Sequence, residues 1–216
     1  PKRKYYDDNQ CKVLLENLEE VSVSYLNLIF CHANGLPATI AETKRCYIRE
    51  FTKKDIPILY EILQEKEVAR FLSEKLEEKE EIEQLMAYIS YVYSFFEYGY
   101  WGIFLKDTNE LIGTALIYYE EEVACWEIGY NLGKRYWGKG YTTEAMQAVL
   151  AFAKEKLAIT EIVGRYAVEN PASGNVMKKL GFQYEKDIPY PCNDGAVMRK
   201  GIQCRLLEME LFDENG

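Results

Sequence analysis

A glycine-rich turn between an apolar strand and a helix is the feature that most limits what this chain can fold into. Residues 135–140 read RYWGKG; they follow the apolar segment 125–132, a predicted strand, and lead into a helix predicted from Tyr141. Glycines at such a junction let backbone N–H groups approach a ligand closely. The helix start adds unpaired N–H donors and the positive end of its dipole, so the junction favours a phosphate group.

Cationic side chains strengthen this prediction. Lys134, Arg135 and Lys139 surround the turn in a chain whose formal net charge is −9. The turn is therefore predicted to bind a ligand that carries a pyrophosphate. Two other phosphate-binding loops do not fit, because the P-loop pattern needs Ser or Thr where Gly140 stands, and the dinucleotide fingerprint needs Gly where Thr143 stands.

A second pattern predicts a short helix further along the chain. Asn170 is a good N-cap, Pro171 fits the first helical position, and Gly181 is well placed to end a helix in a left-handed conformation. The pattern predicts a helix between Pro171 and Leu180. A well-capped surface helix without any further role would account for it equally well.

Together the two stretches resemble signatures of the GNAT superfamily of acyl-CoA N-acyltransferases. Residues 135–140 fit its R/Q-x-x-G-x-G/A pyrophosphate loop, and Asn170, Ser173 and the LGF at 180–182 look like the N-x-x-S…LGF signature of the branch that includes ribosomal-protein N-acetyltransferases. The resemblance runs from about Lys44 to Leu211. It divides the chain into an extension of unknown role, residues 1–43, and an acetyltransferase domain, residues 44–216.

The order of the predicted elements agrees with the GNAT fold. Apolar patterning predicts strands near 46–51, 100–106, 111–119, 123–132, 161–168, 182–186 and 202–212, and helices near 55–64, 77–96, 141–157 and 171–180. The resemblance implies an α/β (α+β) fold, in which a mixed, strongly twisted sheet of six to seven strands is flanked by helices. In the N-terminal extension, residues 12–20 predict an amphipathic helix and residues 21–31 an apolar segment of uncertain type.

The resemblance implies acetyl-CoA as the co-substrate. In GNAT enzymes the strand before the loop, here 123–132, diverges from the next one, here 161–168, and the pantetheine arm enters the resulting V. Backbone groups between Ile128 and Leu132 would then bind that arm, and Gly129 fits a β-bulge. The implied cofactor-binding residues are Ile128, Tyr130, Leu132, Arg135, Trp137, Gly138, Lys139, Gly140, Tyr141, Thr142, Asn170 and Ser173.

Glu127 is the candidate general base. A protonated amine has no free lone pair, so an acceptor for its proton is needed before it can attack a thioester. On an ideal strand Glu127 shares a face with Cys125 and Gly129, whose small side chains leave room for a substrate. The alternative is a structural carboxylate bonded to a neighbouring strand or an arginine. The tyrosine that many GNAT enzymes use as general acid is replaced by Met177, which leaves Ser173 as a weak candidate.

The implied activity is acetyl transfer from acetyl-CoA to a primary amine of a small molecule or a protein N-terminus. One alternative is an acyl-CoA-binding sensor that has lost turnover. Another is that residues 1–43 make the chain an interaction domain of a larger enzyme. The acidic balance disfavours nucleic acid and favours a cationic acceptor.

The remaining composition sets broad limits. No segment approaches the roughly 18 apolar residues of a membrane span. The six scattered cysteines and the single histidine, His32, have no metal-ligand spacing. We therefore expect a cytoplasmic monomer or homodimer without a metal.

Overall fold

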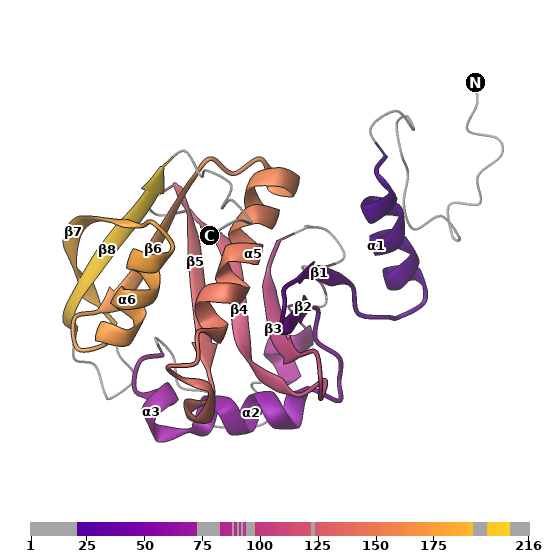
Figure 1. Cartoon of the computed structure of the whole chain (residues 1–216), viewed down its shortest axis with the longest axis horizontal. Coiled ribbons are helices and arrows are strands. Elements are labelled where there is room, and N and C mark those ends of the chain that lie inside the picture. The colour runs from indigo at the N-terminus through magenta and orange to yellow at the C-terminus, as the bar shows by residue number, and fades with distance from the viewer. Residues whose placement is uncertain are drawn as a thin grey trace. The chain divides into compact units, whose positions relative to one another are not determined.

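The computed structural model describes residues 21–72, 83–87, 89, 91, 93, 98–121, 124–191 and 198–207 (Figure 1). The chain divides into two compact units, residues 1–38 and residues 39–216. The predicted helix at 12–20 lies outside the described residues.

The first unit contains one described helix, α1 (Val23–Ala33). Ser22 caps its start, because the Ser22 hydroxyl accepts a hydrogen bond from the Tyr25 amide at 3.1 Å. The helix ends at Asn34, and Gly35 follows with a φ of +65°. The apolar segment 21–31, whose type the sequence left open, is therefore helical from Val23 onwards.

The second unit is built on one eight-stranded sheet with the order β1-β2-β3-β4-β5-β6-β8-β7. Its strands are β1 (Thr39–Glu42), β2 (Cys46–Arg49), β3 (Tyr100–Leu105), β4 (Leu111–Glu120), β5 (Cys125–Leu132), β6 (Glu161–Ala167), β7 (Gln183–Tyr190) and β8 (Arg199–Leu207). Only β5 and β6 pair in parallel, and all other neighbours are antiparallel. The mixed α/β fold predicted from the sequence is confirmed.

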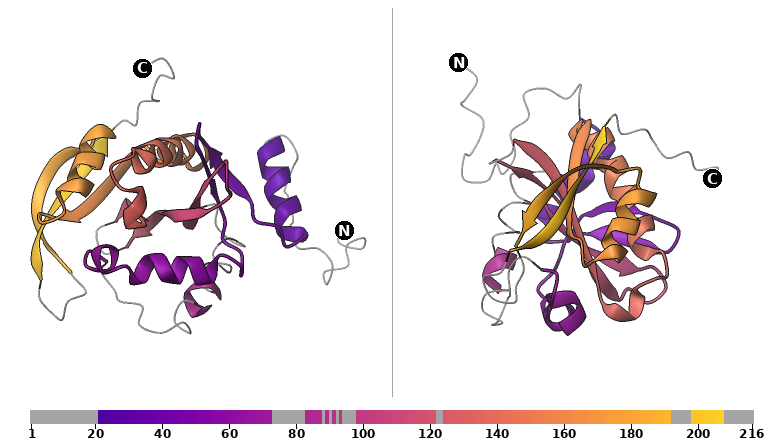
Figure 2. Two further views of the ribbon diagram at one scale, coloured as in Figure 1. Left: turned by 60° about the horizontal axis from the view of Figure 1, so that its bottom comes forward. Right: turned by 90° about the vertical axis from the view of Figure 1, so that its left-hand side faces the viewer.

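Helices cover both faces of this sheet. Figure 2 shows α5 (Tyr141–Leu157) and α6 (Pro171–Lys179) on one face and α2 (Ile56–Gln64) on the other. Met146, Val149 and Leu150 of α5 are buried in the first core, together with Ile128 of β5. Leu59 of α2 belongs to a second core on the opposite face. The sheet is therefore the middle layer, and the corner into α5 lies at the C-terminal end of β5, an inner strand.

Several boundaries differ from the sequence predictions. The strand β1, which precedes residue 44, is additional to the seven predicted strands. It was not predicted, because four residues with exposed ends carry too short a pattern. The short helix α3 (Lys66–Ala69) was not predicted either. The predicted helix at 77–96 falls partly outside the described residues, and 83–87, 89, 91 and 93 are helical. The division at residues 43 and 44 stays a prediction.

None of the helices in the described ranges is long and apolar enough to cross a membrane.

Candidate cofactor and active site

The turn between β5 and α5 has the conformation that its glycines predict. Gly138 and Gly140 have φ angles of +72° and +80°, a region in which side chains with a Cβ are strained. A Cβ placed on Gly138 would meet no atom within 4 Å. Gly140 is the N-cap of α5, and no side chain caps that helix start. The N-cap residue therefore leaves the first amides of α5 uncapped, and such amides suit an anion.

The aromatic residues of the turn contact one another and the strand before it. After Gly133 the chain makes the short 3₁₀ helix η2 (Lys134–Tyr136), and the rings of Tyr136 and Tyr141 stack edge to face with centroids 6.2 Å apart. The Trp137 indole donates to the Leu132 carbonyl at 2.6 Å. Leu132 was predicted to offer its backbone to the cofactor, and this carbonyl is used inside the protein. Thr142 lies in the first turn of α5 and is half-buried.

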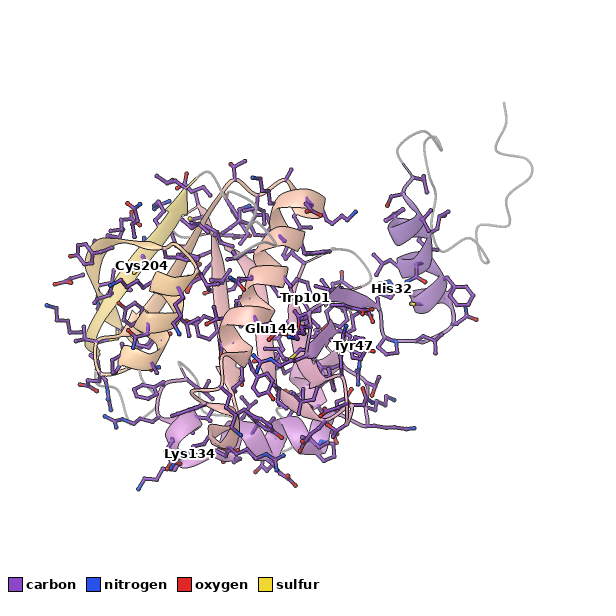
Figure 3. All side chains as sticks on the ribbon, in the orientation of Figure 1. His32, Tyr47, Trp101, Lys134, Glu144 and Cys204 are labelled. Atoms are coloured by element: carbon purple, nitrogen blue, oxygen red, sulfur yellow. The ribbon has the colours of Figure 1, made fainter. Side chains whose placement is uncertain are left out.

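The cations of the turn pair with carboxylates on the surface. Lys134, labelled in Figure 3, pairs with Glu67, and Arg135 pairs with Glu110. The Lys139 ammonium lies 5.7 Å from the centroid of the Tyr136 ring. Both ion pairs are largely exposed, and such pairs contribute about 0–1 kcal/mol each. A phosphate can therefore replace the carboxylate partners at little cost.

The predicted V between β5 and β6 is present. Between these two fully described strands the parallel ladder joins only Glu127 with Val163 and Ile128 with Gly164 (Figure 1). Gly129–Leu132 have no partner in β6 beyond that point. The expected bulge at Gly129 is wrong, because β4 and β5 pair without interruption from Gly113–Leu132 to Glu120–Cys125. Because β5 is paired with β4 along its whole length, the V opens between β5 and β6 without any break on the β4 side.

The last paired position is filled by Met177. A Cβ on Gly164 would lie 2.3 Å from the Met177 methyl carbon and 2.6 Å from its sulfur, so the thioether occupies the space beside the glycine. Met177 is only 2% exposed. It therefore acts as a packing residue at the apex of the V, at the position where the resemblance places a proton-donating tyrosine.

Two predicted contact residues on α6 also make internal bonds. Asn170 caps the helix, since its side-chain oxygen accepts from the Ser173 amide at 3.2 Å. The Tyr130 hydroxyl lies 3.0 Å from both the Ser173 carbonyl and the Ser173 hydroxyl. Tyr130 thus reaches from β5 to the first turn of α6. The structure brings these predicted residues together, beside the opening of the V.

Glu127 lies on the sheet face opposite the α5 core. Strand alternation places its side chain away from that of Ile128, as predicted. The Arg165 Nε donates to the Glu127 carboxylate at 2.5 Å, and a second Arg165 nitrogen pairs with the same oxygen. Arg165 also reaches Glu120 at 3.4 Å. The alternative interpretation of Glu127 anticipated an arginine or a neighbouring strand as its partner, and the structure provides both in Arg165 of β6. Local patterns could not identify which arginine, because the pairing of β5 with β6 cannot be read from them.

The surroundings of Glu127 favour its protonated form. Burial raises the pKa of the Glu127 carboxyl, and hydrogen bonds from Arg165 and Tyr118 offset only part of that effect. Tyr118 is the cross-strand neighbour of Glu127, and burial together with this carboxylate raises the pKa of the Tyr118 hydroxyl. A raised pKa makes this carboxylate a stronger base than an exposed glutamate, which suits a proton acceptor.

Glu144, in the first turn of α5, is shifted in the opposite direction. Burial alone would raise its pKa, but hydrogen bonds from Thr43 and Arg45 outweigh burial, and the pKa of Glu144 is lowered.

These two shifts predict opposite effects of pH on stability. A raised folded-state pKa means that Glu127 costs stability as pH rises through the interval from the ordinary glutamate value, roughly 4.3, up to its folded value. A lowered pKa means that the stabilisation by Glu144 is lost as pH falls from about 4.3 to its folded value. Urea unfolding of the wild type, Glu127→Gln and Glu144→Gln across pH 3 to 7 should show differences of opposite slope. Parallel slopes for the two variants would contradict the assignment.

The residues present fit a diphosphate-bearing cofactor. An anion-binding site is formed by three features: two glycines with positive φ, the open space at Gly138 and the uncapped start of a 17-residue helix. The backbone of β5 beside the V is open to an extended arm. Among the described residues no group of three or more His, Cys, Asp or Glu side chains is arranged to hold a metal ion.

Comparison with known proteins identifies the family. The sequence profile described as "Acetyltransferase (GNAT) domain" matches residues 45–183, which include β2 to β6, the glycine turn and α6. The chain belongs to the GNAT acetyltransferase family. It is an acyltransferase, and enzymes of the GNAT family use acetyl-CoA to acetylate amines. The resemblance to the GNAT family, which was inferred from the two motifs, is confirmed.

Relatives and solved structures agree with this assignment. The N-acetyltransferase YoaA of Bacillus subtilis, named as uncharacterized, is 28% identical over 176 residues, which cover 74% of this chain and 97% of YoaA. The crystal structure of a GNAT-family acetyltransferase from Bacillus anthracis has a TM-score of 0.68 at 24% identity, and the match covers 79% of this chain and 99% of that one.

A third similar protein was solved with the cofactor. RimL, a ribosomal alpha-N-protein acetyltransferase in complex with coenzyme A, has a TM-score of 0.66 at 17% identity, and the match covers 78% of this chain and 97% of RimL. The likeness of this GNAT chain to both structures shows that the fold is shared. Because the relatives are named as enzymes, they do not support the alternative of an inactive sensor.

Proposed function

We propose that this GNAT enzyme binds acetyl-CoA at the corner from β5 into α5 and transfers the acetyl group to a primary amine. The observation that carries the proposal is the end of the β5–β6 ladder at Ile128 and Gly164, combined with the positive-φ glycine turn that joins β5 to α5. An extended arm can add to the exposed edge of β5 while the amides at Gly138–Tyr141 hold the diphosphate.

Different groups of the predicted cofactor residues would contact different parts of acetyl-CoA. Backbone groups of Ile128 and Tyr130 would face the pantetheine arm along β5, and Leu132 would offer its amide, because its carbonyl accepts from the Trp137 indole. Gly138 and Gly140 allow the turn that directs amides to the diphosphate. Side chains at the rim of this site, from Arg135, Trp137, Lys139, Tyr141, Thr142, Asn170 and Ser173, would contact the remainder of the cofactor.

Glu127 would receive the proton of the attacking amine, directly or through a water molecule. The thioester supplies an activated acetyl group, and the protein must supply a neutral amine beside it. Burial raises the pKa of the Glu127 carboxyl, and the hydrogen bond and positive charge of Arg165 offset part of that rise. An incoming ammonium group can compete with the Arg165 guanidinium for the carboxylate, because both are cations that donate hydrogen bonds.

The acceptor is proposed to be a cationic amine, either a small molecule or a protein N-terminus. The formal net charge of −9 favours the approach of such a substrate. We also propose a cytoplasmic location, since acetyl-CoA is available there and Cys31, Cys46, Cys125 and Cys204 are free thiols.

A coenzyme A release assay tests this function. The purified chain would be given acetyl-CoA with three sets of acceptors: small primary amines, peptides with a free N-terminus, and the same peptides with a blocked N-terminus. We expect amine-dependent release with one of the first two sets and none with blocked peptides that lack lysine. Saturable binding of acetyl-CoA without release in any set would overturn the proposed transfer.

A further inference from the structure

Arg45, in the turn between β1 and β2, makes a set of contacts with the cofactor corner. Its backbone N–H donates to one Glu144 carboxylate oxygen at 2.8 Å, and its Nε donates to the other oxygen at 2.6 Å. Its Nη1 donates to the Lys139 carbonyl at 3.0 Å. These partners lie 99 and 94 residues away in sequence. Arg45 therefore ties the first turn of α5 and the glycine turn to another part of the sheet.

The guanidinium also covers the residues between these two partners. It lies 4.2 Å from the centroid of the Tyr141 ring, in a cation–π arrangement. A Cβ placed on Gly140 would be 3.5 Å from the Arg45 Nη2. One side chain thus contacts both Lys139 and Tyr141 and lies beside Gly140 between them. These are the residues whose amides we assign to the diphosphate.

Glu144 gives the contact an electrostatic role. Glu144, labelled in Figure 3, belongs to the first turn of α5, the same turn whose amides would bind an anion. Hydrogen bonds from Thr43 and Arg45 lower the pKa of Glu144 despite its burial, so it is ionised at neutral pH. Without Arg45 this carboxylate would keep its negative charge beside the phosphate site and repel the ligand. Arg45 neutralises it.

We propose that Arg45 is a positioning residue for the cofactor: it holds Lys139–Tyr141 in the conformation that binds a diphosphate and neutralises Glu144 beneath that site. The proposal rests on the proposed acetyl-CoA binding and adds a residue outside the two sequence motifs. A turn that is ordered before the ligand arrives loses less conformational entropy on binding. Loss of Arg45 should therefore weaken binding of the diphosphate part of the cofactor and leave the chemical step unchanged.

Arg45→Met tests the proposal, because methionine keeps an unbranched apolar stem and removes the charge and the donors. By calorimetry we expect the Kd for coenzyme A to rise about tenfold or more, a typical result when charge-assisted hydrogen bonds and preorganisation are lost. KM for acetyl-CoA should rise in parallel while kcat stays within about twofold, as for an interaction present in both the ground state and the transition state. Acetyl-pantetheine, which lacks the diphosphate, should react with Arg45→Met as it does with the wild type.

Lys106→Met is the matched control. Lys106 pairs with Glu42 at 3.0 Å and lies 4.9 Å from the Tyr47 ring centroid, so it is a cation of the same region with a carboxylate and an aromatic partner. Among the described residues the Lys106 side chain contacts Glu42 and Tyr47 but not the glycine turn, and the hydrogen bond from its backbone N–H to the Arg45 carbonyl, at 2.8 Å, is kept in Lys106→Met. Lys106→Met should keep the wild-type Kd for coenzyme A.

Two further variants separate the charge of Arg45 from the geometry of its hydrogen-bond donors. In Arg45→Met/Glu144→Gln the unpaired carboxylate is gone, and part of the lost affinity should return. Arg45→Lys keeps the charge without the forked donors and should bind coenzyme A with an intermediate Kd. An unchanged Kd in Arg45→Met, or equal losses with acetyl-CoA and acetyl-pantetheine, would overturn the positioning role. If the wild type itself does not bind coenzyme A, the proposed function fails instead.

Discussion

Replacing Glu127 with glutamine is expected to lower kcat by about 100-fold or more, the effect of losing a general base in many enzymes. Glutamine keeps the size and hydrogen-bonding capacity of the side chain but cannot accept the proton of an attacking amine. The wild-type rate should rise with pH through the raised pKa of Glu127, and this ascending limb should disappear in the variant. Steady-state kinetics with the best acceptor, measured from pH 5 to 9, provides both readouts.

Glu120→Gln is the control for this prediction. Glu120 also pairs with Arg165, at 3.4 Å, and its side chain is 29% exposed whereas that of Glu127 is 10% exposed. Loss of the weaker partner should leave kcat within about threefold of wild type, because Arg165 keeps its closer contacts with Glu127. If Glu127→Gln kept the full rate and the same pH profile, Glu127 would be a structural partner of Arg165 only.

Gly140→Val is expected to weaken coenzyme A binding by about 100-fold. At a φ of +80° a β-branched residue is strained by roughly 1–2 kcal/mol, and the turn relieves that strain by rotating away from the left-handed region. Rotation redirects the amides that precede and begin α5. Each lost hydrogen bond to a charged phosphate costs roughly 1.5–3 kcal/mol, so two of them account for the predicted loss. Calorimetric titration with coenzyme A measures it.

Gly181→Val separates the effect on binding from the cost of strain. Gly181 ends α6 with a φ of +86°, and a Cβ there would have its nearest neighbour at 3.5 Å, the same distance as at Gly140. Both variants should lose a similar amount of stability in urea, but Gly181→Val should keep its affinity for coenzyme A. Equal affinity in the two variants would show that the glycine turn does not hold the cofactor.

Elements with strong local signals were predictable from the sequence. The helix α6 is bounded by an Asn-Pro start and a Gly end, and the structure places it at Pro171–Lys179. The stripe of Ala145, Met146 and Val149 predicted α5 correctly. By contrast, β1 is a four-residue edge strand whose existence depends on pairing with β2, and such pairing leaves little trace in local composition.

The site was predictable only in part, for the same reason. Glu127 and the glycine turn follow from strand alternation and local motifs. Arg45 and Arg165 contact them across 94 and 38 residues of sequence, and no periodic pattern links such positions. The bulge expected at Gly129 was inferred from a single glycine, and continuous pairing with β4 shows that this glycine stays within a regular ladder. Contacts between distant strands needed the three-dimensional structure.

Calorimetric titration of the wild-type chain with acetyl-CoA and with acetyl-pantetheine tests the central claim most directly. If the amides at the corner from β5 into α5 hold the diphosphate, acetyl-CoA should bind saturably at one site per chain, and acetyl-pantetheine should bind at least about 100-fold more weakly. Equal affinities for the two donors, or no saturable binding of acetyl-CoA, would contradict the claim.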